Sequence, residues 1–205
     1  MKKIVVFALI VLLSLFSLSA AREYVMFGPS AGYNSEAETP ELGLFLHYQL
    51  GAQLNSKFSL GFGTYLFSDF PLSAINDSTK YSNTLNVAIG PAFSVRLSST
   101  LTLTSVFGVD IMMLTPRSGK RSEELTGCGF GLSSGICFIP ESERASTFRL
   151  GFVLGGSMSA IYYENSKDTL SLSGRVYFGF TVQQPFLGVY YPDIYERVID
   201  GIYFR

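Results

Sequence analysis

Residues 85–97 alternate strictly between large apolar side chains and small or polar ones. Leu85, Val87 and Ile89 begin the apolar series, and Asn86 and Ala88 begin the other. Because successive side chains of a β-strand point to opposite faces, this pattern predicts a strand with one apolar face and one thin, polar face. Segments with the same alternation recur along the chain: residues 24–33, 44–54, 58–67, 85–97, 101–113, 128–138, 148–162 and 169–182.

Residues 1–21 have the features of a secretory signal peptide. Lys2 and Lys3 precede the apolar run 4–16, and small residues at 19–21 predict cleavage before Arg22. The apolar run is shorter than the roughly 20 residues that a spanning helix needs. No later apolar stretch is long enough for such a helix, so an integral protein of this sequence must be a closed β-barrel.

The connections between the predicted strands differ in length in a regular way. Those after the first, third and fifth strands are long, whereas residues 55–57 and 98–100 are tight turns. With the N-terminus in the periplasm, the long loops face outside, as in outer-membrane barrels. The connection at 141–147 departs from this rule. The lengths of the predicted strands match the roughly 9–11 residues that a tilted membrane strand needs.

A soluble β-sandwich or lipocalin-like barrel is the competing fold, and residue size argues against it. Soluble barrels place their apolar face inside and their polar face in water. Here the polar faces are rich in Gly, Ser, Ala and Thr, which suits a narrow interior, and the few mid-strand charges lie on that same face. The pattern therefore favours an apolar face turned toward lipid.

Between residues 24 and 182 the chain resembles the small eight-stranded outer-membrane barrels, through its pattern and without a subfamily motif. The resemblance implies an all-β, antiparallel, up-and-down transmembrane barrel in a Gram-negative-type outer membrane. Its partners would be outer-membrane lipid and the barrel-assembly machinery. The chain departs from the usual pattern because Phe204 is followed by Arg205 and residues 183–205 remain after the eighth strand. This tail is either a periplasmic segment or a further strand pair, 186–191 and 201–204, which would make ten strands. The sequence thus divides into a signal peptide (1–21), a barrel (22–182) and a tail (183–205).

Polar and charged side chains are expected on the inward face, as a lumen cluster with a structural or a gating role. Its members are His47, Gln49, Gln53, Tyr65, Arg96, Asp110, Arg149, Arg175 and Tyr177. They could line a polar channel or form a packed polar core. Eight strands leave an interior only just wide enough for side chains, and inward arginines must find partners, so we favour the packed core.

Motifs for catalysis, cofactors or metal binding are missing from the sequence. A hydrolase site could be imagined from His47, Asp110 and Ser59 or Ser94, but inward serines are too common for this to carry weight. We expect no enzyme activity, no cofactor and no metal. The net charge of −1 does not indicate a nucleic-acid partner. Cys128 and Cys137 are expected on opposite faces of one strand, too far apart for a disulfide.

The sequence leaves two functions in competition. One is a structural or surface-exposed protein whose loops bind an extracellular ligand through charged residues: Glu36, Glu38, Glu41, Arg117, Lys120 and Arg121. The other is a narrow channel for small or hydrophobic solutes, through the lumen or through a lateral opening. Pro29, Pro91 and Gly155-Gly156 could weaken the wall for such an opening. A lipid-modifying barrel enzyme is the least favoured reading.

Overall fold

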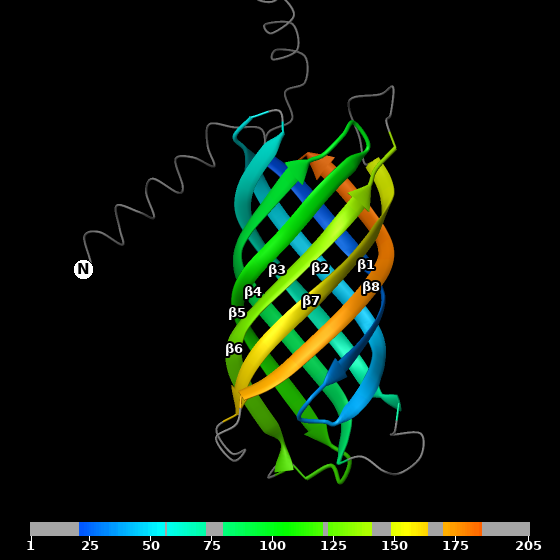
Figure 1. The fold of residues 1–205 in the computed structure, drawn as a ribbon, viewed down its shortest axis with the longest axis vertical. Coiled ribbons are helices and arrows are strands. Elements are labelled where there is room, and N and C mark those ends of the chain that lie inside the picture. The colour runs from blue at the N-terminus through cyan, green and yellow to red at the C-terminus, as the bar shows by residue number, and fades with distance from the viewer. Residues whose placement is uncertain are drawn as a thin grey trace, which may run out of the picture.

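The computed structural model describes residues 21–55, 57–72, 80–120, 123–140, 149–163 and 170–185. They form β1 (Ala21–Asn34), β2 (Thr39–Gln53), β3 (Phe58–Pro71), β4 (Tyr81–Arg96), β5 (Leu101–Pro116), β6 (Leu125–Phe138), β7 (Arg149–Tyr163) and β8 (Leu170–Pro185). Each strand pairs antiparallel with the next, and β8 pairs with β1 to close a barrel (Figure 1). This confirms the predicted eight-stranded, up-and-down barrel rather than its ten-stranded alternative.

Both tails of the predicted domain plan lie mostly outside the described residues. The proposed signal peptide reaches the described part only at Ala21, where β1 begins. Of the predicted tail, Gln183 to Pro185 belong to β8, and residues 186–205 are not described. Within the described part of the chain, no helix has the length and apolar character needed to cross a membrane.

The strands have 14–16 residues each, and all except β7 are longer than the sequence pattern predicts. The expected boundaries stopped at polar residues that in fact continue the alternation. Residues 39–43 extend β2, and residues 68–71 extend β3 toward the same end of the barrel. The first connection is therefore a four-residue turn at 35–38 rather than a long loop.

The outward and inward faces are assigned as the alternation predicts. Leu154 and Leu150 are 68% and 69% exposed on the outside of β7, whereas Ile161 is buried. Cys128 is exposed and Cys137 is buried, and both thiols are free, which confirms that no disulfide joins them. One strict alternation thus separates an apolar exterior from a filled interior.

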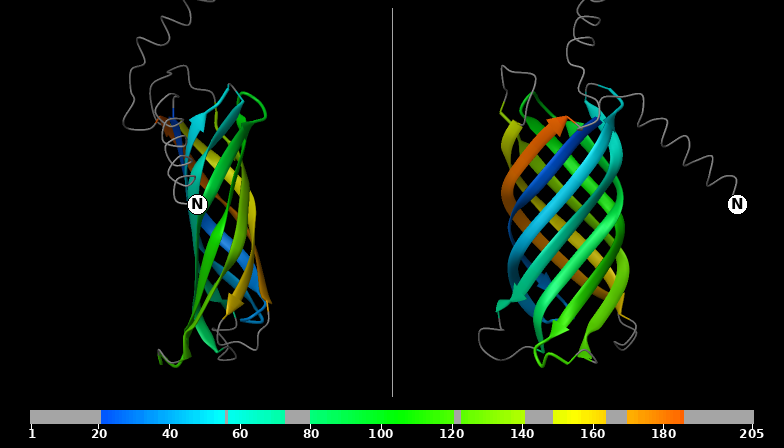
Figure 2. Two further views of the ribbon diagram at one scale, coloured as in Figure 1. Left: turned by 90° about the vertical axis from the view of Figure 1, so that its left-hand side faces the viewer. Right: turned by 180° about the vertical axis from the view of Figure 1, so that it is seen from behind.

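The barrel is flattened, being narrower in the left-hand view of Figure 2 than in the right-hand one. Figure 1 labels β1 and β8 at one edge and β4, β5 and β6 at the other. At each edge one pair of neighbouring strands has a gap in its pairing near mid-strand. Gly28-Pro29 lies between the pairs Phe27–Phe180 and Ser30–Tyr177 on β1 and β8, and Gly90-Pro91 similarly interrupts β4–β5. Proline has no N–H to donate, so these two sites locally weaken the wall.

Apolar side chains fill the interior in two layers. The end where β1 begins and β8 ends is called the terminal end below, and the opposite end the loop end. The larger cluster occupies the middle and the terminal half and includes Tyr24, Met26 and Phe45. A smaller cluster closes the loop end: Tyr81, Met112, Leu114, Ile161 and Tyr163. The polar interior residues lie between and beside these two layers.

Candidate functional site in the barrel interior

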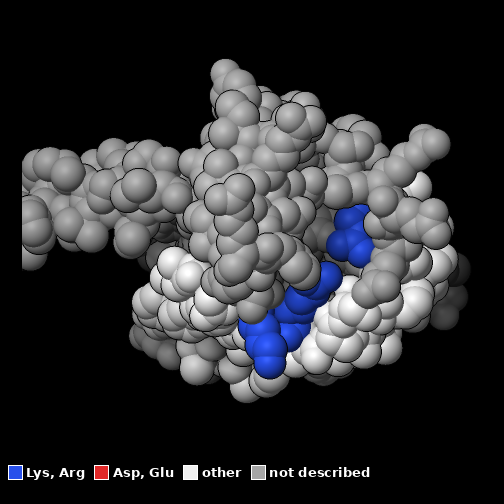
Figure 3. Space-filling view, turned by 90° about the horizontal axis from the view of Figure 1, so that it is seen from above, with Lys and Arg blue, Asp and Glu red and all other residues white. Residues whose placement is uncertain are grey.

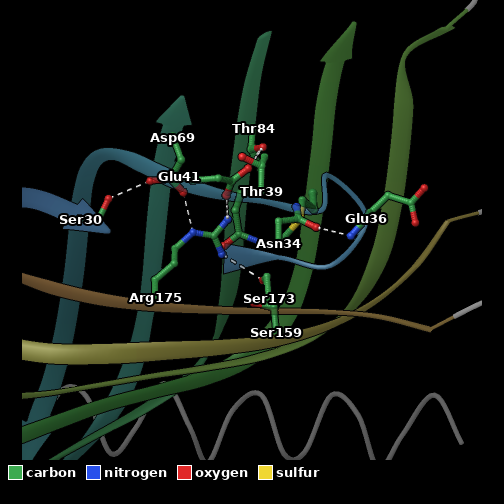
Figure 4. Close-up of polar contacts among 12 residues, drawn as sticks. Ser30, Asn34, Glu36, Thr39, Glu41, Asp69, Thr84, Ser159, Ser173 and Arg175 are labelled. Carbon is green, nitrogen blue, oxygen red and sulfur yellow. Dashed lines mark hydrogen bonds and ion pairs between the residues drawn. The ribbon is translucent and has the colours of Figure 1, made fainter. Parts of the chain in front are cut away.

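Arg175 on β8 is the centre of a buried ion-pair network. Its Nε donates to Asp69 Oδ2 at 2.5 Å, and its second terminal nitrogen lies 3.6 Å from Glu41 Oε2 (Figure 4). Its other terminal nitrogen donates to Ser173 Oγ at 3.1 Å. The guanidinium also lies 5.2 Å from the centre of the Phe67 ring. All three charged side chains are at most 1% exposed, so the arginine is paired and desolvated together with its partners.

The two carboxylates of this network receive further hydrogen bonds from neighbouring strands. Ser30 Oγ on β1 donates to Asp69 Oδ1 at 2.8 Å, and Thr84 Oγ1 on β4 donates to Glu41 Oε1 at 2.5 Å. Buried charges are tolerated when they are paired and their remaining lone pairs accept hydrogen bonds. The network therefore joins strands β1, β2, β3, β4 and β8 across the interior.

Asp110 on β5 forms a second buried polar centre. It accepts hydrogen bonds from the Tyr65 hydroxyl at 3.0 Å, from Asn86 Nδ2 at 2.6 Å and from Ser159 Oγ. Three neutral donors on one carboxyl group stabilise it without a basic partner. This centre adds β5 and β7 to the strands that are joined across the interior.

Together the two centres fill the middle of the interior with side chains that bond to one another. Eight strands leave room for side chains but little more, and the polar groups here bond to one another. Beyond them, toward the loop end, Met112, Leu114 and Tyr163 are at most 1% exposed. A solute passing along the axis would have to break buried ion pairs and then displace an apolar layer.

The terminal half of the interior is less completely bonded. Tyr177 shares a hydrogen bond with Ser133 at 3.0 Å, and Gln183 Nε2 donates to the Tyr24 hydroxyl at 3.0 Å. In contrast, His47 and Gln49 are each 1% exposed, and no side-chain nitrogen or oxygen of either has a hydrogen-bond partner among the described residues. Buried polar groups of this kind require water, an ion or another ligand.

Two of the predicted lumen residues lie at the rim instead. Arg96 and Arg149 are half-buried at the terminal end and donate to the carbonyl oxygens of Ser99 and Pro140. Figure 3 looks onto this end and shows Lys and Arg but no Asp or Glu among the described residues. The side chain of Gln53 lies outside the described part of the structure. Arg96 and Arg149 therefore take no part in the buried network.

Among the predicted surface residues, Glu41 was placed wrongly. It is 1% exposed and pairs with Arg175, because β2 already begins at Thr39 and turns Glu41 inward. Glu36 and Glu38 do lie in the turn between β1 and β2, and Arg117 and Lys120 are exposed beyond β5. Arg121 lies outside the described residues.

Sequence reasoning missed Asp69, Thr84, Asn86 and Ser159 as interior partners. Asp69 and Thr84 lie between the predicted strands 58–67 and 85–97, in a polar segment that the sequence predicts to be a loop. The sequence does contain a signal for acidic partners, because an arginine on the inward face requires acidic side chains at the same level along the barrel axis. Phe70 and Leu42, which pair across β2 and β3, continue the outward apolar series past these acids.

The structure does not assemble the imagined hydrolase site. No serine in the described part of the chain bonds to His47, and Asp110 bonds to Tyr65, Asn86 and Ser159 instead. Among the described residues, no three His, Cys, Asp or Glu side chains gather in a group that could hold a metal ion. The interior carboxyl groups are therefore engaged in bracing the barrel.

No family model matches this chain, and no curated protein matches it in sequence. Among solved structures, Neisserial surface protein A is 11% identical, with 82% of this chain and 98% of that chain covered and a TM-score of 0.51. The attachment invasion locus protein of Yersinia pestis (11% identity, 82% and 100% covered) and OprG from Pseudomonas aeruginosa (10% identity, 82% and 97% covered) have TM-scores of 0.46 and 0.39. The chain has the fold of the small eight-stranded outer-membrane β-barrels, which its strand pattern resembles.

Proposed function

We propose that this protein is an integral outer-membrane barrel with a sealed interior, which acts through the surface that it presents at its loop end. The observation that carries this proposal is the buried bracing of Arg175 with Asp69 and Glu41, next to the apolar layer at the loop end. A barrel filled in this way supports its rim and loops but leaves no polar path along its axis.

The exterior supports a position in lipid. Apolar side chains are exposed along the outward faces, and aromatic side chains mark both ends, as expected for the girdles of a membrane barrel. At the loop end, Tyr33, Phe70 and Tyr162 are about half exposed; at the terminal end, Phe138 and Phe152 pair directly across β6 and β7. Strands of 14–16 residues exceed the roughly 9–11 that a membrane requires, so the barrel would project beyond the bilayer.

Membrane placement predicts a large effect for a charge on the outward face. We expect Leu154→Arg, near the middle of β7, to lower the free energy of unfolding in lipid vesicles by about 2–4 kcal/mol. The matched control is Leu97→Arg, because Leu97 is also exposed but lies in a turn at the terminal end, where the cost falls to about 0–1 kcal/mol. Urea titration followed by gel mobility measures both, and equal small effects would argue for a water-facing exterior.

The rim at the loop end carries the proposed contact surface. Its described charges are of both signs: Glu36, Glu38, Lys80, Arg117, Lys120, Glu123 and Glu124. Lys120 and Glu123 form an exposed ion pair at 3.8 Å, which contributes little to stability. Charges of both signs at this rim suit an extracellular partner that also carries both signs.

A second candidate function is lateral passage of a small hydrophobic solute through the wall. The observation that favours it is the interrupted ladder at Gly28-Pro29 and Gly90-Pro91, one at each edge of the flattened barrel. At both places a strand lacks hydrogen bonds in the middle of the wall, where opening costs least. This route would avoid the braced interior.

Planar-bilayer recording separates these functions. We expect no discrete conductance steps from the reconstituted barrel, because ions along the axis would meet the buried ion pairs and the apolar layer. Discrete openings at low voltage would contradict the sealed interior. Lateral passage would be favoured by a different pair of results. The barrel would show no conductance steps but would take a hydrophobic fluorescent solute into vesicles, and the double variant Pro29→Val, Pro91→Val would reduce this uptake.

A further inference from the structure

Two sulfur atoms meet in the terminal half of the interior, from opposite walls of the barrel. Met26 on β1 and Cys137 on β6 are both fully buried, and their Sδ and Sγ atoms are 3.9 Å apart. Thr104 Oγ1 lies 3.8 Å from the first sulfur and 3.9 Å from the second. This region does not take part in the ion-pair network around Arg175.

In the structure the Cys137 thiol donates a hydrogen bond to Met26 Sδ, and the same separation of the two sulfurs also fits a shared metal ion. A metal–sulfur bond of about 2.3 Å and a trigonal angle place two sulfur ligands about 4.0 Å apart. A linear two-ligand site would need a wider separation, so this spacing calls for a third ligand. Thioether and thiol donors favour soft ions such as Cu(I) over Mg²⁺ or Ca²⁺. The thioether also disfavours Zn²⁺, whose protein ligands are Cys, His, Asp and Glu.

His47 is the candidate for that third ligand. It occupies the position on β2 directly opposite Met26 on β1, and both side chains point inward. Residues paired in this way have Cβ atoms about 4.5–5.5 Å apart. His47 is 1% exposed, and neither ring nitrogen has a hydrogen-bond partner among the described residues. A buried imidazole with both nitrogens unpaired is in itself an unexplained polar group.

We propose that Met26, Cys137 and His47 form a binding site for a soft monovalent metal ion, with Cu(I) as its ligand. On binding, the Cys137 thiol releases its proton and the thiolate coordinates the metal, while the Met26 thioether and one His47 nitrogen complete a three-coordinate site. The other ring nitrogen remains a donor. Because one donor is a thioether, no three His, Cys, Asp or Glu side chains are needed, in keeping with the absence of such a group among the described residues.

Access to the site is limited by the fold. Toward the terminal end, Gln183 and Tyr24 form a hydrogen bond and are at most 8% exposed. The metal would therefore enter most easily while the barrel is folding. The competing explanation is a water molecule on His47, which would satisfy the imidazole without involving either sulfur.

The test supplies Cu(I) as its bicinchoninate complex, under ascorbate and without oxygen, while the mature barrel refolds into detergent. Heat-modifiable gel mobility confirms folding. We expect each folded barrel to remove one Cu(I) from the chromophoric complex, with X-ray absorption showing two sulfur ligands and one nitrogen ligand. Cys137→Ser, Met26→Leu and His47→Asn should each weaken competition with bicinchoninate at least about tenfold, since even outer partners of a metal site are worth that much.

Cys128→Ser is the matched control, because Cys128 is on β6 as well but is exposed on the outward face. It should retain the metal with unchanged affinity. The proposal is overturned if the folded protein leaves all Cu(I) with bicinchoninate, if Cys128→Ser abolishes uptake, or if the interior variants bind as tightly as the parent. Should Cys137→Ser fail to fold, Met26→Leu and His47→Asn decide the question, because the first nearly conserves side-chain volume and the second keeps a polar side chain at its position.

Discussion

Replacing Arg175 by methionine is expected to lower the free energy of unfolding by about 3–5 kcal/mol, because it leaves Asp69 and Glu41 as buried charges without a basic partner. Both carboxylates are at most 1% exposed, so water cannot replace the guanidinium. Methionine keeps much of the volume of the side chain, so the effect reports on charge rather than on a cavity. Since the chain has no Trp, unfolding is followed by circular dichroism and by heat-modifiable gel mobility.

Restoring charge balance should recover most of this loss. The combined variant Arg175→Met, Glu41→Gln, Asp69→Asn has neutral side chains at all three positions and retains the acceptor atoms for Ser30 and Thr84. The surface control is Lys120→Met, which removes one partner of an exposed ion pair and should change stability by about 0–1 kcal/mol. If Arg175→Met costs no more than this control, the buried network is not what braces the barrel.

The barrel could be predicted from the strand pattern because alternation is a local property of each segment. Each outward Leu or Phe and each inward Ser or Gly could be assigned from its own segment, and the structure keeps these assignments in all eight strands. Strand pairing followed, since tight turns fix antiparallel neighbours and closure satisfies every edge. The order of strands therefore needed no long-range information.

The interior site could be predicted only in part, because its partners meet across the barrel. Arg175 and Asp69 are 106 residues apart in sequence and lie on β8 and β3, which are not neighbours. Which inward residues share a height depends on strand tilt and register, and neither can be obtained from one segment alone. Glu41 and Asp69 lie in polar segments, which predict loops when each segment is considered alone. Their negative charge is nevertheless what the inward Arg175 requires.

The flattened cross-section of the barrel could not be predicted from any single segment of the sequence either. Pro29 and Pro91 are expected from the sequence to break strands, but the positions of these strands at the two edges of the barrel emerge only after closure (Figure 1). At both sites a glycine from the neighbouring strand, Gly179 or Gly108, approaches the backbone so closely that a Cβ on Gly28 or Gly90 would overlap it. Two Gly-Pro steps opposed by glycine thus allow the sharp curvature that the broad faces lack.

Adding a single methyl group at Gly131 is expected to cost about 2–4 kcal/mol of stability, since it forces the Tyr65 ring away and disrupts the hydrogen bonds around Asp110. A Cβ at this inward position of β6 would overlap the Tyr65 hydroxyl and Asp110 Oδ2. Gly174→Ala is the matched control: it makes the same chemical change on the outward face of β8, where no atom lies within 4 Å of the added carbon. Its effect should stay within about 0.5 kcal/mol.

The second-site variant Tyr65→Phe identifies the cause. It removes the hydroxyl that the new methyl group meets, while Asn86 and Ser159 still donate to Asp110. Alone it should cost about 1–2 kcal/mol for the lost hydrogen bond to a charged group. Combined with Gly131→Ala it should cost less than the sum of the two, with a favourable coupling of about 1–3 kcal/mol in a double-mutant cycle. Strict additivity would mean that Gly131 is required for the geometry of β6. It would contradict the view that Gly131 is required to leave space for the Tyr65 hydroxyl.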